Sequence, residues 1–153
     1  MPRLLMRITM LLCATLSFNL FAAEANLHVD DPYVRLAPPG AQTTGAFMVI
    51  KNTGNVDRKL VNAESPAAKT VQLHNHFNEN GVMKMRQVES IDVKANAQAE
   101  LKPGSYHVML IDMKVELKEG DSVPITLIFD DGTKTIVTAP VRKLPMTMPA
   151  SKP

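Results

Sequence analysis

Residues 70–88 read TVQLHNHFNENGVMKMRQV, and this stretch decides the fold. Apolar residues alternate with His74 and His76, which is the period of two that is typical of a half-buried β-strand. Asn80-Gly81 is the strongest short signal for a two-residue hairpin turn of type I′. The stretch therefore predicts an antiparallel pair of strands, at Thr70–Phe77 and Val82–Val88.

The same short alternation recurs outside this hairpin, between turn signals such as Pro38-Pro39-Gly40 and Asp130-Asp131-Gly132. No segment has the period of a long amphipathic helix. The other expected strands are Leu27–Ala37, Gly45–Asn52, Arg58–Ala63, Ala97–Leu101, Tyr106–Met113, Ser122–Phe129 and Lys134–Val141. Strands at this spacing predict one all-β domain, either a two-sheet β-sandwich or a small barrel with Greek-key connections.

The two ends of the chain differ from its middle. Arg3 and Arg7 precede an apolar run, and Ala23-Glu24-Ala25 supplies the small-x-small pattern of a signal-peptidase site. The run of about 14 residues is shorter than the roughly 20 that span a bilayer. We therefore expect a periplasmic protein whose mature chain does not insert stably into a membrane. The expected divisions are a signal peptide at 1–25, a β-sandwich domain at 26–141 and a flexible tail at 142–153.

Composition excludes several functions. The single cysteine, Cys13, lies in the expected signal peptide, so the mature chain can form neither a disulfide nor a thiolate metal site. A formal net charge of +2 gives no electrostatic support for binding nucleic acid. The sequence has no Gly-x-Ser-x-Gly elbow, Gly-rich phosphate loop or His-Glu-x-x-His helix. We therefore expect a binding protein and not an enzyme.

Methionine and histidine are the unusual residues of the predicted hairpin. The chain has ten methionines and four histidines. Counting outward from a tight turn places Met85 opposite His76 and diagonal to His74. Met83 lies on the same face. Two imidazoles and two thioethers are then expected within reach of one ion.

A second strand carries the same residue types. His107 and Met109 project together from one face of the strand that contains them. Imidazole and thioether ligands suit the soft ion Cu(I), whereas Ca, Mg and Mn prefer oxygen. A blue-copper electron-transfer site needs a cysteine thiolate, which the mature chain lacks. The residues therefore favour a site that carries an exchangeable metal.

Other interpretations of these residues stay open. Methionines in strands are often core fillers, and we expect this for Met48 and Met113. For Met83 we give equal weight to a core position and to a place in the site. Lone histidines are more often surface or hydrogen-bonded residues, which we expect for His28 and His76. A slip of one residue in register would send each side chain to the other face. The candidate ligands are His74, Met85, His107 and Met109.

The spacing of these four residues resembles a known motif. It follows the pattern H-x10-M-x21-H-x-M, which is the copper motif of the PCuAC family of periplasmic copper chaperones. The resemblance covers nearly all of residues 29–141. Segments that also resemble the family are Asp31–Gly40, Leu60–Ala68, Gly81–Arg86, Leu101–Leu110 and Leu117–Pro124.

The resemblance implies a cupredoxin-like Greek-key β-sandwich that binds one Cu(I) through the four motif residues, and it selects His74 over His76. It implies delivery of copper to the copper A centre of cytochrome c oxidase. The implied partners are the oxidase subunit that carries this centre and a Sco-type thiol protein. Some family members hold a second, cupric ion in a His- and Met-rich tail, but this tail has Met146 and Met148 without histidine, so the resemblance does not extend to a Cu(II) site there. Alternatives are copper sequestration for tolerance and a metal-free β-sandwich binding module.

Overall fold

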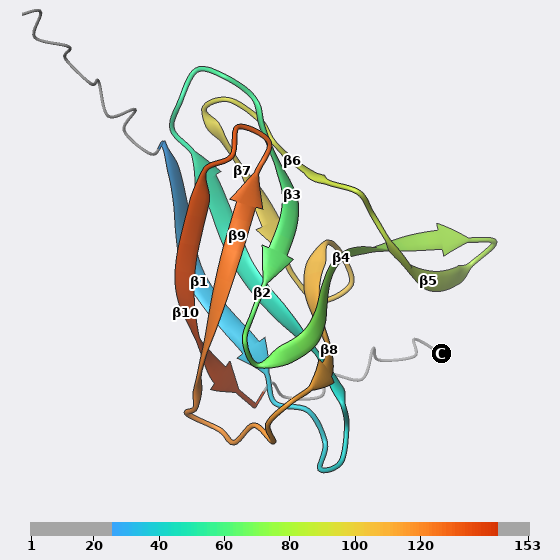
Figure 1. The fold of residues 1–153 in the computed structure, drawn as a ribbon. Coiled ribbons are helices and arrows are strands. Elements are labelled where there is room, and N and C mark those ends of the chain that lie inside the picture. Colours follow the sequence, from blue (N-terminus) through green and yellow to red (C-terminus); the bar gives the residue numbers. More distant parts are fainter. Residues whose placement is uncertain (1–25, 144–153) are drawn as a thin grey trace, which may run out of the picture.

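The computed structural model describes residues 26–143, and these form ten β-strands joined by turns and loops (Figure 1). The predicted signal peptide and the tail residues Met146 and Met148 lie outside the described residues. Within residues 26–143, no helix is long and apolar enough to cross a membrane. The strands are β1 (Leu27–Arg35), β2 (Thr43–Asn52), β3 (Arg58–Glu64), β4 (Ala68–Glu79), β5 (Val82–Gln87), β6 (Ile91–Val93), β7 (Ala97–Leu101), β8 (His107–Met113), β9 (Ser122–Phe129) and β10 (Lys134–Arg142).

The strands form one hydrogen-bonded path that folds into two layers. The path runs β5-β4-β8-β2-β1-β10-β9-β3-β6, and β7 pairs with β2 beside it. The first and last strands join the layers through a short parallel pairing, in which Val34 lies opposite Val141. In Figure 1, β10, β9 and β3 lie in front of β1 and β2. The predicted all-β sandwich is therefore confirmed.

Alternating side chains build the core between the layers. On β8, Val108 and Leu110 are fully buried in this core. His107 and Met109 therefore point to the opposite, outer face of the sheet. Met48 is a core residue and Met113 packs against the core, as predicted for both. Burial of each large apolar side chain contributes roughly 1.5–3 kcal/mol, so this core holds the sheet that carries His107.

The nine expected strands are all present, with ends within two residues of the predicted positions. Strand β6, at Ile91–Val93, was not predicted. Three residues are too few for a period of two to stand out from the surrounding sequence. β10 ends at Arg142, one residue beyond the expected end of the domain, because Arg142 pairs with Arg35 of β1.

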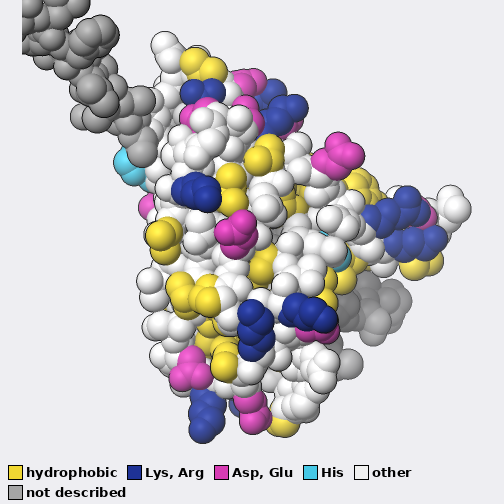
Figure 2. Space-filling model, viewed as in Figure 1, with side chains coloured by type: hydrophobic (Ala, Val, Ile, Leu, Met, Phe, Trp, Pro, Cys, Tyr) yellow, Lys and Arg dark blue, Asp and Glu magenta, His cyan; other side chains and the backbone are white. Residues whose placement is uncertain are grey.

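Strands β4 and β5 form the predicted hairpin, called the hairpin arm (residues 68–87) below. His76 pairs with Met85, so the predicted register is confirmed. Asn80 and Gly81 have φ angles of 53° and 84°, and a type I′ turn needs both to be positive. The outer part of the arm stands clear of the sandwich (Figures 1 and 2), and every residue of β5 is exposed. Met83 is 54% exposed and is therefore not a core filler.

Candidate metal centre

Pairing across the outer face of one sheet brings the candidate residues into register. His74 of β4 lies directly opposite His107 of β8, and their ring centroids are 5.8 Å apart. Two residues along the same strands, and therefore on the same face, Gln72 lies opposite Met109. Residues paired across neighbouring strands point to the same face. Two strands distant in sequence therefore place two imidazoles and a thioether side by side.

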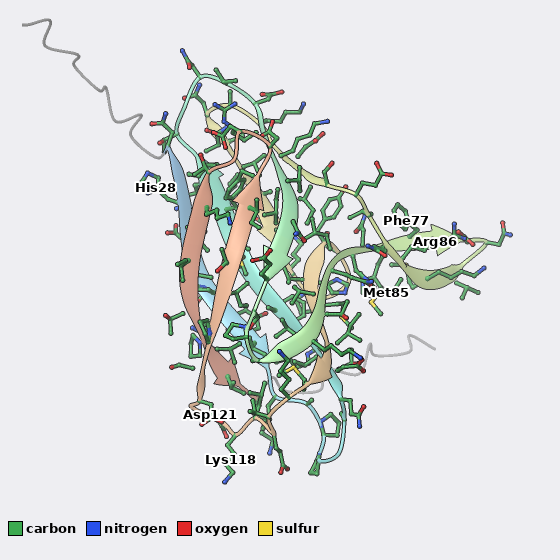
Figure 3. All side chains as sticks on the ribbon, in the orientation of Figure 1. His28, Phe77, Met85, Arg86, Lys118 and Asp121 are labelled. Carbon is green, nitrogen blue, oxygen red and sulfur yellow. The ribbon has the colours of Figure 1, made fainter. Side chains whose placement is uncertain are left out.

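The hairpin arm adds a second thioether to this face. Sδ of Met85 lies 3.0 Å from Nε2 of His107. Figure 3 shows Met85 near the base of the arm, where β4 leaves the sandwich. Met85 is 46% exposed, whereas His107 is 3% exposed. The contact thus joins a buried imidazole to a thioether that solvent can reach.

A backbone carbonyl sets the tautomer of His107. Nδ1 of His107 lies 2.9 Å from the carbonyl oxygen of Ser105, so its N–H donates to that oxygen. In the neutral ring, Nε2 then keeps a lone pair that faces the sulfur of Met85. Burial lowers the pKa of His107, and the nearby His76, His74 and Arg35 lower it further against the opposing effect of the Ser105 carbonyl. Two candidate donor atoms therefore lie close together without a proton between them, as binding of a soft cation requires.

His74 carries an unpartnered nitrogen. Its Nε2 lies 2.9 Å from Oε1 of Gln72, so the Nε2–H donates to the amide oxygen. Its Nδ1 is buried and has no hydrogen-bond partner. Burial lowers the pKa of His74, and the charge of His76 lowers it further. A buried polar atom without a partner costs about 1–3 kcal/mol, a cost that a metal ion bound to Nδ1 would offset.

An open cavity of about 440 Å³ lies against this face. Met85, His107 and Met109 line it together with His76, while His74 is not among its lining residues. Gly45 lies opposite Met109, and a Cβ there would approach the ring of Phe47 to 3.0 Å. The glycine therefore leaves room both for the ring and for the cavity above Met109.

Aromatic contacts hold His107 from the other side. The ring centroids of Phe47 and His107 are 6.0 Å apart, and those of Phe47 and Tyr33 are 5.3 Å apart. The guanidinium carbon of Arg35 lies 5.4 Å from the centroid of Phe47. Packed rings restrict the rotamers of their neighbours. The ring of His107 is therefore oriented before a metal ion binds.

All four predicted ligands lie on this outer face. We call them, together with His76, the His–Met cluster; its members are His74, His76, Met85, His107 and Met109. For His76 the sequence predicted a surface or hydrogen-bonded residue; it is half-buried, lines the cavity and has a long contact of 3.4 Å from Nδ1 to the carbonyl oxygen of Ser105. His28 is exposed at the start of β1, as predicted.

Sequence reasoning missed the residues that orient the cluster. Gln72 could have been found, because it shares the face of His74 by alternation. Phe47 could not have been found, because its approach to His107 depends on the pairing of distant strands. Within residues 26–143, no three side chains of His, Cys, Asp or Glu could together hold a metal ion. A metal held by this cluster would therefore need thioether ligands.

The fold and the cluster define a β-sandwich domain with imidazoles and thioethers gathered on the outer face of one sheet. The LpqE-like family model matches residues 27–141, and the chain belongs to this family. Protein RP573 of Rickettsia prowazekii (strain Madrid E) is 36% identical over 129 residues, which are 82% of this chain and 71% of that protein. A Leifsonia xyli subsp. xyli lipoprotein is 35% identical over 117 residues, 76% of this chain and 69% of that protein.

Solved structures share the fold. The solution structure of CuI-DR1885 from Deinococcus radiodurans has a TM-score of 0.59 and 33% identity, and the match covers 80% of this chain and 83% of that one. The copper-bound PCuAC domain from PmoF2 has a TM-score of 0.67 and 19% identity, with 78% and 94% covered. At that identity the second likeness shows the fold alone. The resemblance to the PCuAC family is thus confirmed.

Proposed function

We propose that this chain is a periplasmic copper chaperone that binds one Cu(I) and delivers it to the copper A centre of cytochrome c oxidase. The contact between Met85 and His107 carries the proposal, because a lone pair on Nε2 faces a thioether sulfur at 3.0 Å. A solution structure of the similar protein DR1885 is that of its Cu(I) form. The proposed ligands are His74, Met85, His107 and Met109.

The donor chemistry fits copper carriage. Neutral imidazoles and thioethers are ligands that Cu(I) prefers, and neither carries the negative charge of a thiolate. A thiolate protein such as the proposed Sco-type partner, or the thiolate-containing copper A site, binds Cu(I) more strongly. The open cavity and the exposed side of Met85 give such a partner access to the ion. Transfer of copper from the cluster to such a partner is therefore thermodynamically favourable. The proposed role is transfer of a metal without catalysis.

Removal of both thioethers tests the site. We expect Met85→Ala combined with Met109→Ala to lower the Cu(I) affinity at least about 100-fold, because loss even of outer-sphere partners of metal ligands costs roughly 10–100-fold. Competition with a chromogenic Cu(I) chelator measures this affinity in the purified mature chain. Met113→Leu is the matched control, since Met113 lies on the same strand as Met109 but packs against the core. An affinity of the double variant within threefold of the wild type would rule out methionine ligation.

Delivery needs a separate experiment. The Cu(I)-loaded chain is mixed with the purified apo form of the oxidase subunit, with and without a Sco-type thiol protein. Appearance of the copper A absorbance supports chaperone function. Tight Cu(I) binding without transfer in either mixture would favour sequestration for copper tolerance over the proposed role.

The lowered pKa values of His74 and His107 predict a shallow pH dependence of Cu(I) binding. Protons compete with the metal only below each folded pKa. Two imidazoles with ordinary pKa values near 6.5 would together reduce the affinity about 100-fold between pH 7.5 and 5.5. Because burial keeps both rings neutral to lower pH, and thioethers do not protonate, we expect a clearly smaller decrease. Chelator competition at several pH values measures it, and a decrease of 100-fold or more would contradict the prediction.

A further inference from the structure

The His–Met cluster contains one imidazole more than the motif needs. His76 lies directly opposite Met85 and two residues from His74 on the same face of β4. Its ring centroid is 5.2 Å from that of His107, closer than the 5.8 Å between His74 and His107. Its Nδ1 lies 3.4 Å from the carbonyl oxygen of Ser105, a long contact that leaves the ring weakly held.

Either imidazole of β4 is at a suitable distance to share an ion with His107. A metal–nitrogen bond of about 2.0 Å and a further 1.1 Å or so to the ring centre place two rings on one ion roughly 5–6 Å apart. Both measured separations lie in this range. Within residues 26–143, the three rings as they stand do not form a site of three histidines. His74 and His76 are therefore alternatives to each other.

The two imidazoles differ in their access to solvent. His76 lines the open cavity, whereas His74 does not and is tied to Gln72 through Nε2. Further out on the face of His76, Met83 pairs with Asn78 and is 54% exposed. Along this face, ligand atoms lead from the buried His107 through the half-exposed Met85 to the exposed Met83. Met85 is therefore shared by two groups of candidate ligands. The inner group also contains His74, His107 and Met109, and the outer group also contains His76 and Met83.

We propose that His76, Met85 and Met83 form an outer exchange position through which Cu(I) enters and leaves the inner site. The proposal rests on the proposed function. In release, a bond from Cu(I) to His76 forms as the bond to His74 breaks. A bond to Met83 then forms as the bonds to His107 and Met109 break, so that the ion passes from four ligands to three. The ion stays Cu(I), and no electron is transferred. The incoming protein then takes the ion from the exposed end of the hairpin arm, without having to reach the buried His107.

Release kinetics separate an exchange residue from a resident ligand. The Cu(I)-loaded mature chain is mixed with excess chelator in a stopped-flow instrument, and the affinity is measured in parallel. For His76→Asn we expect an affinity within about threefold of the wild type and a release rate at least tenfold lower. Met83→Leu is expected to slow release in the same direction. His74→Asn is expected to weaken the affinity at least 100-fold, as loss of an inner ligand should.

Controls keep each outcome decisive. His28→Asn removes an exposed histidine outside the cluster and should change neither quantity. X-ray absorption of the Cu(I) form counts nitrogen and sulfur neighbours, and the His76→Asn variant should keep the wild-type count. An unchanged release rate in His76→Asn would overturn the outer position, and so would a loss of affinity equal to that of His74→Asn. Absence of Cu(I) binding in the wild type would instead overturn the proposed function.

Discussion

Replacing His107 with asparagine is expected to lower the Cu(I) affinity by more than about 100-fold, the upper range for loss of outer-sphere partners of metal ligands. His107 is the member of the cluster that contacts or faces most of the others. Its Nε2 lies 3.0 Å from Sδ of Met85, and it pairs with His74 across the sheet. Loss of its ring therefore removes one proposed ligand and the fixed point around which the others are arranged.

Asparagine is chosen because its amide can still donate to the carbonyl of Ser105, so that this part-buried carbonyl keeps a partner. Thermal unfolding followed by circular dichroism checks that the variant folds. Chelator competition then measures its affinity for Cu(I). His28→Asn serves as the matched control. An affinity within tenfold of the wild type, in a folded His107→Asn variant, would mean that the metal lies elsewhere.

Local sequence signals were sufficient for the hairpin arm. Asn80-Gly81 determines the turn, and the alternation around His74 determines which side chains share a face. Because turn and alternation agree, the pairing of His76 with Met85 could be predicted without any long-range information. Short β6 could not be predicted, because its pairing with β3 depends on the assembled sheet.

The meeting of the arm with β8 depends on non-local pairing. Nothing in residues 70–88 indicates that His74 lies opposite His107, more than thirty positions later. The family motif linked these residues, but it did not indicate how deeply each is buried. His107 is enclosed because Phe47 packs on one side of it and Met85 on the other. Together the two contacts involve β2, β5 and β8, and no local pattern encodes how these three strands meet.

The division between rigid and exposed parts has a functional consequence. His107 and Met109 belong to a strand whose opposite face forms the core, so their backbone positions are fixed by packing. Met85 belongs to a strand that is exposed along its whole length. Few buried contacts mean that such a segment opens locally at low cost in free energy. Of the proposed ligands, Met85 can therefore move with the ion while His107 and Met109 on β8 stay in place.

Exchanging the residues Lys84 and Met85 is expected to abolish Cu(I) binding while the composition stays the same. Alternation places Lys84 on the opposite face of β5, where it pairs with Glu79 at 2.9 Å. The double variant Lys84→Met, Met85→Lys moves the thioether away from His107 and brings an ammonium group toward the cluster. Because this charge repels a bound cation, we expect a larger loss of affinity than in Met85→Ala.

The single variant Lys84→Met is the matched control, since it adds a thioether on the wrong face and leaves Met85 in place. Its affinity should equal that of the wild type. Every residue of β5 is exposed, and surface substitutions usually change the free energy of unfolding by less than about 0.5 kcal/mol, so both variants should melt close to the wild type. Chelator competition measures the affinities. Retention of wild-type affinity by the exchanged variant would mean that methionine content, and not the register of the hairpin arm, determines copper binding.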